Sequence, residues 1–243
     1  MKKLLILQMR PEDITAESEF EAILRVGEID RKFVRRIRVE QLKNIDINID
    51  DYSAIIAGGS PFDISIPASE KSDIQNYVEA FFNRLFQKLI PEDFPFLGAC
   101  SGNGLLGNYC GTEISGKYAE PIGNVKINIT EEGKKDPLLK GFPNSFKALV
   151  GHKEACDDVP CDAVLLATSK SCPVQMFRIK NNIYATQFHP EADEDEFKLR
   201  IRTYKDYGYF KPEEADVLIA KIKGTKTPFP KIILRRFINI YHH

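Results

Sequence analysis

A cysteine flanked by small residues is the first candidate for chemistry in this chain. Cys100 lies in the stretch GACSG (98–102), between an apolar run and a helix-like segment. This G-x-nucleophile-x-G pattern predicts a sharp turn from a strand into a helix, with the nucleophile in a strained, exposed position. The positive end of that helix would favour the thiolate, the reactive form of cysteine. The pattern is short, however, and a buried structural cysteine in a tight turn also satisfies it.

A cysteine nucleophile needs a base, for which histidine is suited. Two of the four histidines end the chain, which leaves His152 and His189. His189 follows a strand-like stretch, and Glu191 stands two residues later, so both side chains can project to the same side. A carboxylate beside the imidazole would orient it and stabilise the imidazolium. Alternatively, Glu191 begins an acidic helix and His189 is polar surface.

The elements that must position these residues alternate between strand and helix. Strand-like runs and helical patterns are found in this order: strand 3–7, helix 20–29, strands 33–39 and 52–57, helix 74–89 and strand 94–99. Short, nearly continuous apolar strands separated by a helix indicate parallel strands buried on both faces. Their carboxyl ends meet at one edge of a sheet, so we expect the glycine-rich stretches at 58–59 and 98–102 to lie along that edge.

The second half of the chain has a different pattern. Alternating residues at 125–130 and three closely spaced strand-like runs predict antiparallel structure, and helical patterns follow at 193–204 and after Pro228. The predicted fold class is α/β: a doubly wound, mostly parallel sheet with helices on both faces, a small antiparallel β part and a helical C-terminal extension. We expect a domain at 1–192 and its extension at 193–243.

Composition excludes several classes of partner. The chain has 34 Lys and Arg against 35 Asp and Glu, a net charge of -1, which offers no general attraction for nucleic acid or anionic lipid. The start MKKLLILQMR has a short apolar run without a small-residue cleavage site, which favours a strand over a signal peptide. No stretch approaches the roughly 20 apolar residues that span a bilayer. We therefore expect a cytoplasmic protein that binds neither nucleic acid nor membrane.

The cysteines indicate reduced thiols. Five cysteines without a CxxC pair favour a reducing compartment over a disulfide framework. If Cys100 is prone to form a thiolate, iodoacetamide should modify it before the other four, which are Cys110, Cys156, Cys161 and Cys172. His152, Cys156 and Cys161 match no usual zinc spacing and lack a fourth ligand, so we expect no metal and no cofactor.

Two stretches carry a resemblance to a known family. GACSGNG (98–104) and TQFHPE (186–191) resemble the two signatures of class I glutamine amidotransferases, over about residues 2–191. The resemblance puts Cys100, His189 and Glu191 in the nucleophile, base and orienting positions. It implies a doubly wound α/β fold and hydrolysis of the glutamine side-chain amide through a thioester, with release of ammonia, as in a GMP-synthase amidotransferase domain.

A third stretch, IIAGGSPFD (55–63), resembles the oxyanion strand of the family. By this resemblance, the backbone N–H groups of Gly59 and Ser101 would hold the oxyanion of the tetrahedral intermediate.

The sequence departs from the family next to the nucleophile. Where relatives commonly have Gly-His-Gln, Gly102 is followed here by Asn103 and Gly104, which removes a long amide side chain from the substrate pocket. A roomier pocket for a larger substrate would follow. The weaker candidates for substrate binding are Gly58, Asn103, Gly104 and His152.

Three functions are compatible with these features. The first is a hydrolase of glutamine whose ammonia acceptor is bound by another chain, either a separate synthetase subunit or a homo-oligomer partner, because the stretch after residue 191 is too short for a synthetase domain. The second is a γ-glutamyl peptidase that cleaves larger γ-glutamyl amides. The third is a non-catalytic binding module, which has no need for the complete set of Cys100, His189 and Glu191.

Overall fold

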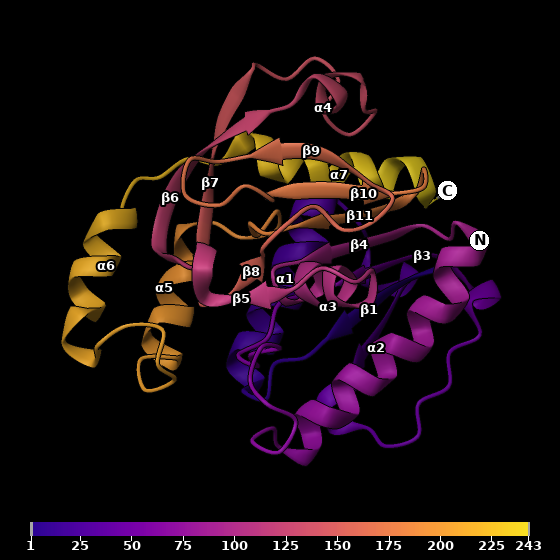
Figure 1. Ribbon diagram of the computed structural model, residues 1–243, viewed down its shortest axis with the longest axis horizontal. Coiled ribbons are helices and arrows are strands. Elements are labelled where there is room, and N and C mark those ends of the chain that lie inside the picture. Colours follow the sequence, from indigo (N-terminus) through magenta and orange to yellow (C-terminus); the bar gives the residue numbers. More distant parts are fainter. Residues whose placement is uncertain (1, 243) are drawn as a thin grey trace.

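A large mixed sheet organises the molecule, for which the computed structural model describes residues 2–242 (Figure 1). In that part of the chain the sheet has nine strands in the order β2-β1-β3-β4-β11-β10-β9-β6-β7. Their bounds are β1 Lys3–Gln8, β2 Val34–Arg38, β3 Tyr52–Ala57, β4 Phe96–Ala99, β6 Glu120–Ile129, β7 Ser145–His152, β9 Ala163–Thr168, β10 Met176–Ile179 and β11 Ile183–Thr186. A separate antiparallel pair is formed by β5 Ile114–Ser115 and β8 Ala155–Cys156.

The helices are α1 Asp13–Gly27, α2 Asp73–Glu92, α3 Ser101–Tyr109, α4 Glu131–Lys135, α5 Glu194–Thr203, α6 Ala215–Ile222 and α7 Pro228–Tyr241. Short 3-10 turns occupy Arg31–Phe33, Val39–Gln41, Ile49–Asp51, Gly116–Tyr118 and Pro212–Glu214. No helix within residues 2–242 is both long enough and apolar enough to cross a membrane.

The α/β class agrees with the prediction, but the sheet is mixed rather than mostly parallel. Strands β2, β1, β3, β4 and β11 are parallel, whereas β10, β9, β6 and β7 join antiparallel. The antiparallel part continues the same sheet through β11, so it is neither small nor a separate layer. Only three residues, 180–182, connect β10 to β11, and such a short connection permits only an antiparallel pair.

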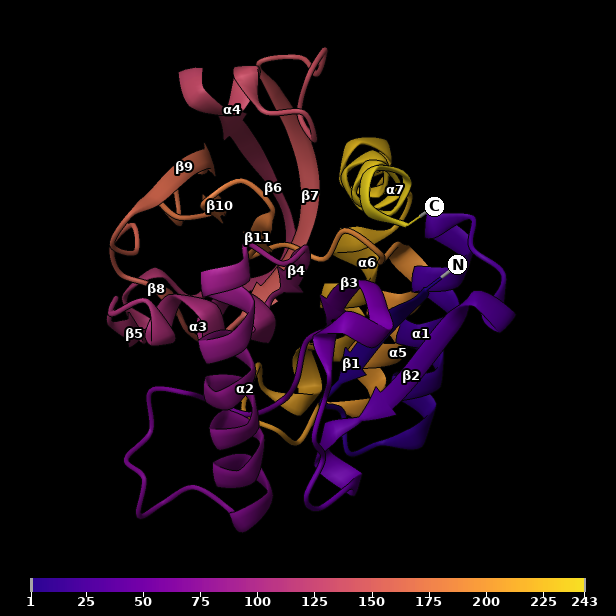
Figure 2. The same ribbon diagram turned by 90° about the vertical axis from the view of Figure 1, so that its right-hand side faces the viewer.

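Helices cover both faces of the parallel half. Figure 2 shows α2 and α3 on one side of the sheet and α1 and α7 on the other. The side chains of β1 alternate accordingly: Leu5 and Leu7 pack into the cluster that contains Phe82 of α2, and Leu4 and Ile6 into the cluster that contains Phe237 of α7. This burial on both faces explains the continuous apolar runs in the sequence.

The segment after residue 192 is largely helical. Helix α7 lies against α1 and buries Ile233, Leu234 and Phe237 in the same cluster as the central strands. Helices α5 and α6 pack with Ile122 of β6 and Leu149 of β7 in a smaller cluster. The described helices thus share hydrophobic clusters with the sheet, and the division at residue 192 stays a prediction.

The parallel strands bring the chemical residues to one edge. Register pairs Leu7 with Ala57, Ala57 with Gly98, and Ala99 with Thr186, so β1, β3, β4 and β11 end side by side. The segments that follow these four ends carry Arg10, the glycines at 58–59, Cys100 and His189. The prediction that both glycine-rich stretches share an edge is confirmed.

Helix α7 provides a test of this packing. Phe237→Ala should lower the free energy of unfolding by about 3–5 kcal/mol, because it removes a buried ring and leaves a cavity. Phe237 is 0% exposed, whereas Ile240 on the same helix is 37% exposed. Ile240→Ala should therefore cost less than about 1 kcal/mol. Urea denaturation of both variants is the measurement, and equal losses would contradict the assigned inner face of α7.

Candidate active site

Cys100 occupies the predicted strand-to-helix turn. It has φ 54° and ψ -103°, an unfavourable backbone conformation for a residue with a side chain, between β4 and the first residue of α3. Its own N–H donates to the Thr186 carbonyl at 2.8 Å, which fixes the turn to β11. A β-carbon at Gly98 would lie 2.6 Å from the Gly102 carbonyl oxygen, so the turn requires glycine there. Strain of this kind costs roughly 1–3 kcal/mol and is typical of functional sites.

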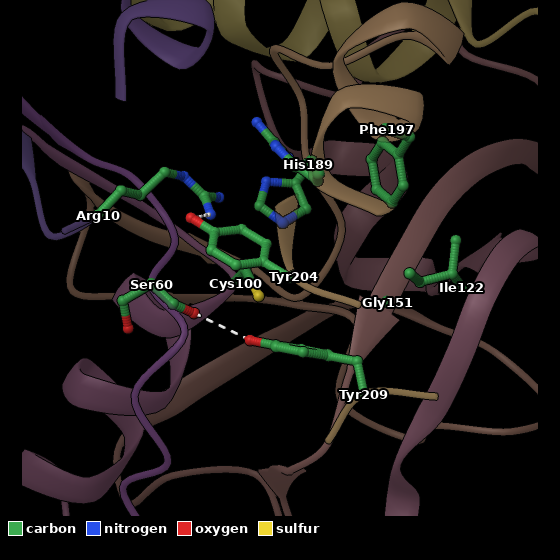
Figure 3. Close-up of a pocket in the computed structure, with 10 residues that line it drawn as sticks. Arg10, Ser60, Cys100, Ile122, Gly151, His189, Phe197, Tyr204 and Tyr209 are labelled. Carbon is green, nitrogen blue, oxygen red and sulfur yellow. Dashed lines mark hydrogen bonds between the residues drawn. The ribbon is translucent and has the colours of Figure 1, made fainter. Parts of the chain in front are cut away.

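His189 and Glu191 form a buried hydrogen-bonded pair. Nδ1 of His189 lies 2.9 Å from Oε1 of Glu191, and both residues are buried. A β-carbon on Gly59 would lie 2.9 Å from His189 Cε1 and 3.6 Å from Cys100 Cβ, so the imidazole and the cysteine meet above the same glycine. His189 and Cys100 also line the same pocket, as Figure 3 shows.

Arg200 of α5 extends this pair. Its Nη2 donates to the same Oε1 of Glu191 at 2.8 Å, so this oxygen accepts from His189 and Arg200 together. Burial alone would raise the pKa of Glu191, but the neighbouring His189 and Arg200 outweigh it and hold the pKa well below the ordinary value. The sequence gives no signal for Arg200, which lies on a surface-like helix pattern after the motif.

A second buried ion pair lies beneath the glycine loop. Nε of Arg10 donates to Oε2 of Glu19 at 2.7 Å, and Nη1 of Arg10 donates to the Tyr204 hydroxyl at 3.2 Å. The side chains of Arg10 and Glu19 are 4% and 0% exposed. Arg10 follows β1 at the same sheet edge as Cys100, a position that could have identified it from the sequence.

Glu19 changes the expectation for the oxyanion donors. The Gly59 N–H donates to Oε2 of Glu19 at 3.3 Å and is therefore not free to bind an oxyanion in this structure. A β-carbon at Gly58 would lie 2.3 Å from Oε1 of Glu19, so this loop is packed directly on the carboxylate. The physical reason is that a buried carboxylate needs donors, and the Gly59 N–H supplies one. The Ser101 N–H lies beside the Cys100 sulfur.

The protonation of Cys100 and His189 differs from the predicted thiolate at Cys100. Burial raises the pKa of Cys100 to about 11, although Arg10 and Arg200 act in the opposite direction. Burial also lowers the pKa of His189, against the influence of Glu191. At neutral pH the pair is therefore a thiol and a neutral imidazole. The helix terminus does not outweigh the loss of water around the sulfur.

Labelling order needs the same correction. Burial raises the pKa of Cys110 to about 11 as well, and Cys161 is the exposed thiol. The basis for expecting Cys100 to react first with iodoacetamide is therefore removed, since Cys161 is the more accessible.

The weaker substrate-binding candidates separate into two groups. Gly104 and His152 line a second pocket that also contains Cys100, whereas neither Gly58 nor Asn103 lines either pocket around the cysteine. Asn103 is fully buried and its Oδ1 accepts from Cys156 Sγ at 3.3 Å. Successive residues of a helix point about 100° apart, which explains why only one of the neighbours at 103 and 104 faces the pocket.

Gly104 does not leave open space beside it. A β-carbon there would come 2.8 Å from Cδ1 of Ile64, so the apolar side chain of Ile64 occupies the room expected from the missing glutamine. Ile64 is held in turn by its N–H, which donates to Oε1 of Glu154 at 2.6 Å. The expected enlargement of the pocket at Gly104 is therefore at least partly filled.

His152 belongs to a separate buried cluster. Its Nε2 lies 2.8 Å from Oε2 of Glu120, and its Nδ1 lies 3.0 Å from the Glu154 carbonyl. Burial would raise the pKa of Glu120, but hydrogen bonds from His152, Ser171 and Gln175 outweigh it and lower the pKa. Both ring nitrogens of His152 therefore face acceptors, and the ring bridges the Glu120 carboxylate and the Glu154 carbonyl.

Cys172 completes a trio with Glu120 and His152 whose ligand atoms all lie within 4.8 Å of one another. This grouping differs from the His152, Cys156 and Cys161 set considered in the sequence. Glu120 already accepts from His152 and Gln175 on Oε2, and from Ser169 and Ser171 on Oε1. Its carboxylate is satisfied by protein donors, and we interpret the cluster as structural.

The fold and the site together define an α/β protein with a cysteine-centred site at the carboxyl edge of its parallel strands. The chain belongs to the class I glutamine amidotransferase family, whose model matches residues 33–203.

The relatives and solved structures are consistent with this membership. The chain is 30% identical to one subunit of the glutamine-hydrolyzing GMP synthase of Sulfurisphaera tokodaii, over 63% of this chain and 74% of that protein. It is 28% identical to the corresponding protein of Sulfolobus acidocaldarius, over 67% and 76%. A glutamine amidotransferase structure from Thermotoga maritima matches with a TM-score of 0.76 and 19% identity over 100% of both chains, which supports the fold.

The pH dependence of turnover tests the lowered pKa of His189. Because a general base must be neutral and burial lowers the pKa of His189, the acid limb of kcat/KM for glutamine hydrolysis should lie below the ordinary histidine value of about 6.5. Glu191→Gln removes a charge that raises this pKa, so the limb should move further toward acid while kcat falls. An acid limb above 6.5, or a shift toward alkali in the variant, would contradict the assignment.

Alanine variants of His152 and His189 should differ in their effects on stability and on turnover. His152→Ala removes a hydrogen-bond partner from the buried Glu120 carboxylate and should lower the free energy of unfolding by roughly 1–3 kcal/mol. His189→Ala should cost less, because Glu191 keeps Arg200, yet should abolish most turnover. Denaturation curves and rates for both variants are the check. If His152→Ala kept wild-type stability and lost turnover, His152 would be the base.

Proposed function

We propose that the protein hydrolyses the γ-amide of a glutamyl group, glutamine being the simplest substrate, through a thioester on Cys100. In this proposal Cys100 is the nucleophile, His189 the base, and Glu191 the residue that orients His189. One observation carries the proposal: the strained Cys100 shares a pocket at the edge of the sheet with His189, whose Nδ1 is hydrogen-bonded to the buried Glu191. Membership of a glutamine amidotransferase family supports the substrate class.

The hydrogen bond between His189 and Glu191 supports one direction of proton transfer in this proposal. Nδ1 of His189 donates to Glu191, which leaves the lone pair of Nε2 available. As the Cys100 sulfur attacks the amide carbon, Nε2 takes the thiol proton, and Glu191 stabilises the imidazolium. The C–N bond then breaks and the nitrogen leaves with the proton from Nε2. Nε2 of His189 then activates a water molecule, which hydrolyses the thioester to the γ-carboxylate and regenerates the Cys100 thiol.

The oxyanion would be held first by the Ser101 N–H, which lies beside the sulfur. The Gly59 N–H can contribute only after it leaves Glu19, to which it donates at 3.3 Å. Developing charge on the oxyanion is a stronger acceptor than a neutral carbonyl, so the exchange is favoured most in the tetrahedral state.

Two pockets meet at Cys100 and take different parts of the substrate. The leaving nitrogen must reach His189, so it belongs in the pocket that His189 lines; the glutamyl chain belongs in the other, which His189 does not line. That second pocket includes Asp63 and Lys153, which form an ion pair. Groups of both charges suit the α-ammonium and α-carboxylate of a glutamyl group.

A second chain is part of the proposal for an amidotransferase role. The relatives from Sulfurisphaera tokodaii and Sulfolobus acidocaldarius are each one subunit of a glutamine-hydrolyzing GMP synthase. On this likeness we propose that a separate synthetase subunit binds the ammonia acceptor. An oligomer of this chain is the other arrangement that the sequence leaves open. Co-purification of the native complex and its mass distinguish the two.

Removal of the nucleophile tests the proposal. Cys100→Ala should reduce ammonia release from glutamine by at least about a thousandfold, because the thioester can no longer form. Cys161→Ala removes an exposed thiol outside both pockets and serves as the matched control with wild-type rates. Turnover that survives in Cys100→Ala would overturn the assignment, and a wild type that binds γ-glutamyl compounds without cleaving them would favour a non-catalytic binding module.

A further inference from the structure

The space around Cys100 is too small for a glutamyl substrate. The two pockets that meet at this residue have volumes of about 30 Å³ and 20 Å³. A pocket of this size holds about one or two water molecules, whereas a glutamine molecule is several times larger. Binding of a glutamyl amide at Cys100 therefore requires part of the pocket wall to move.

The connection between α5 and α6 forms a wall of both pockets. It begins with residues 204–211, of sequence YKDYGYFK, which we call the tyrosine segment. Tyr209 lines both pockets, and Tyr204 lines the pocket that also contains His189 (Figure 3). A movement of this segment would therefore enlarge the space on both sides of Cys100.

Side-chain contacts attach the tyrosine segment to the rest of the molecule. The Tyr209 hydroxyl donates to the Ser60 carbonyl at 3.2 Å (Figure 3). Nζ of Lys153 lies 4.8 Å from the centroid of the Tyr209 ring and donates to the Tyr207 carbonyl at 3.4 Å. The Tyr207 hydroxyl donates to the carboxylate of Glu12. Each of these contacts is weak enough to break singly.

The backbone of the tyrosine segment is not bonded to the sheet. Among the described residues, its backbone bonds stay local: the Tyr207 N–H donates to the Tyr204 carbonyl at 3.0 Å, and the Lys211 carbonyl accepts from the Glu214 N–H at 2.8 Å. Strands β6 and β7, which also contribute to the pockets, are paired along their length. Segments with few backbone bonds to other elements open at the lowest free-energy cost, so this wall is the one that opens most easily.

Tyr204 is the end of the segment that stays in place. It is 5% exposed, and its hydroxyl accepts from Nη1 of Arg10 at 3.2 Å and lies 2.8 Å from Oγ1 of Thr15. Residues 205–208, which follow, are exposed. Outward rotation beyond Tyr204 would remove Tyr209 from both pockets and leave the contact with Arg10 intact.

We propose that the tyrosine segment is a lid over Cys100, which opens to admit the substrate and is held closed by the hydrogen bond from Tyr209 to the Ser60 carbonyl. The inference rests on the proposed function for the identity of the substrate, a glutamyl amide. The contacts that hold the lid over Cys100 do not depend on that identity. Closure of such a segment over a bound substrate is a common way to separate a reacting group from water.

Alkylation of Cys100 tests the lid without turnover. Tyr209→Phe keeps the ring but removes the hydroxyl that holds the lid closed, so the open form should be more populated. We expect N-ethylmaleimide to modify Cys100 about three- to tenfold faster in this variant, which corresponds to the loss of one neutral hydrogen bond. Peptide mass spectrometry measures the rate. The exposed Cys161 is the internal standard, and its rate should not change.

Two controls separate opening of the lid from other effects. Tyr118→Phe removes the hydroxyl of a tyrosine in the turn Gly116–Tyr118, which lines neither pocket, and should leave the rate at Cys100 unchanged. Iodoacetamide is smaller than N-ethylmaleimide, so Tyr209→Phe should accelerate its reaction less. A changed thiolate fraction at Cys100 would instead accelerate both reagents equally.

The outcomes separate the lid from the proposed function. If N-ethylmaleimide modifies Cys100 no faster in Tyr209→Phe than in the wild type, or if both reagents are accelerated equally, the lid is overturned. Hydrolysis of glutamine by the wild type would then leave the proposed function standing. Selective acceleration of N-ethylmaleimide in a protein that does not hydrolyse glutamine would support the lid and overturn the proposed function.

Discussion

The buried contact of Arg200 with Glu191 is the interaction on which the site depends. One carboxylate oxygen accepts from His189 and from Arg200, so a helix outside the signature motifs fixes the histidine through its partner. Arg200 also approaches Glu19, at 3.9 Å, and Glu19 holds Arg10 and the Gly59 N–H. Buried charges are tolerated only when each has its partners, so this network couples the positions of α5, the glycine loop and the base.

Burial of the site also determines the protonation of Cys100 and His189. The two arginines near the half-buried Cys100 favour its thiolate, yet partial burial outweighs them and raises the pKa of Cys100 to about 11, while burial lowers the pKa of His189. The Cys100 sulfur is therefore held as a thiol at neutral pH. In the proposed reaction, proton transfer from this thiol to His189 would accompany attack on a bound carbonyl.

Local patterns in the sequence predict the features that are set by residues close together in the chain. The strand periods, the helix over 74–89, the turn at Cys100 and the meeting of strand ends all follow from residue spacing, and family signatures identify His189 and Glu191. Long-range contacts are not visible in this way. Glu19 beneath the glycine loop, Arg200 behind Glu191, and Ile64 in the space beside Gly104 are consequences of tertiary packing. The sequence also does not reveal that the antiparallel strands extend the parallel sheet. Their alternation of apolar and polar residues would be the same if they formed a separate layer.

The central claim is that Cys100 forms an acyl-enzyme with a γ-glutamyl group, and acid quenching during turnover tests it most directly. Mass spectrometry of peptides from the quenched wild-type protein should find one γ-glutamyl group on the peptide that contains Cys100. In Glu191→Gln, any γ-glutamyl adduct should also lie on Cys100. The adduct should be absent when substrate is omitted or when Cys100 is replaced by alanine. Steady turnover without any adduct on Cys100, or an adduct on another residue, would contradict the account.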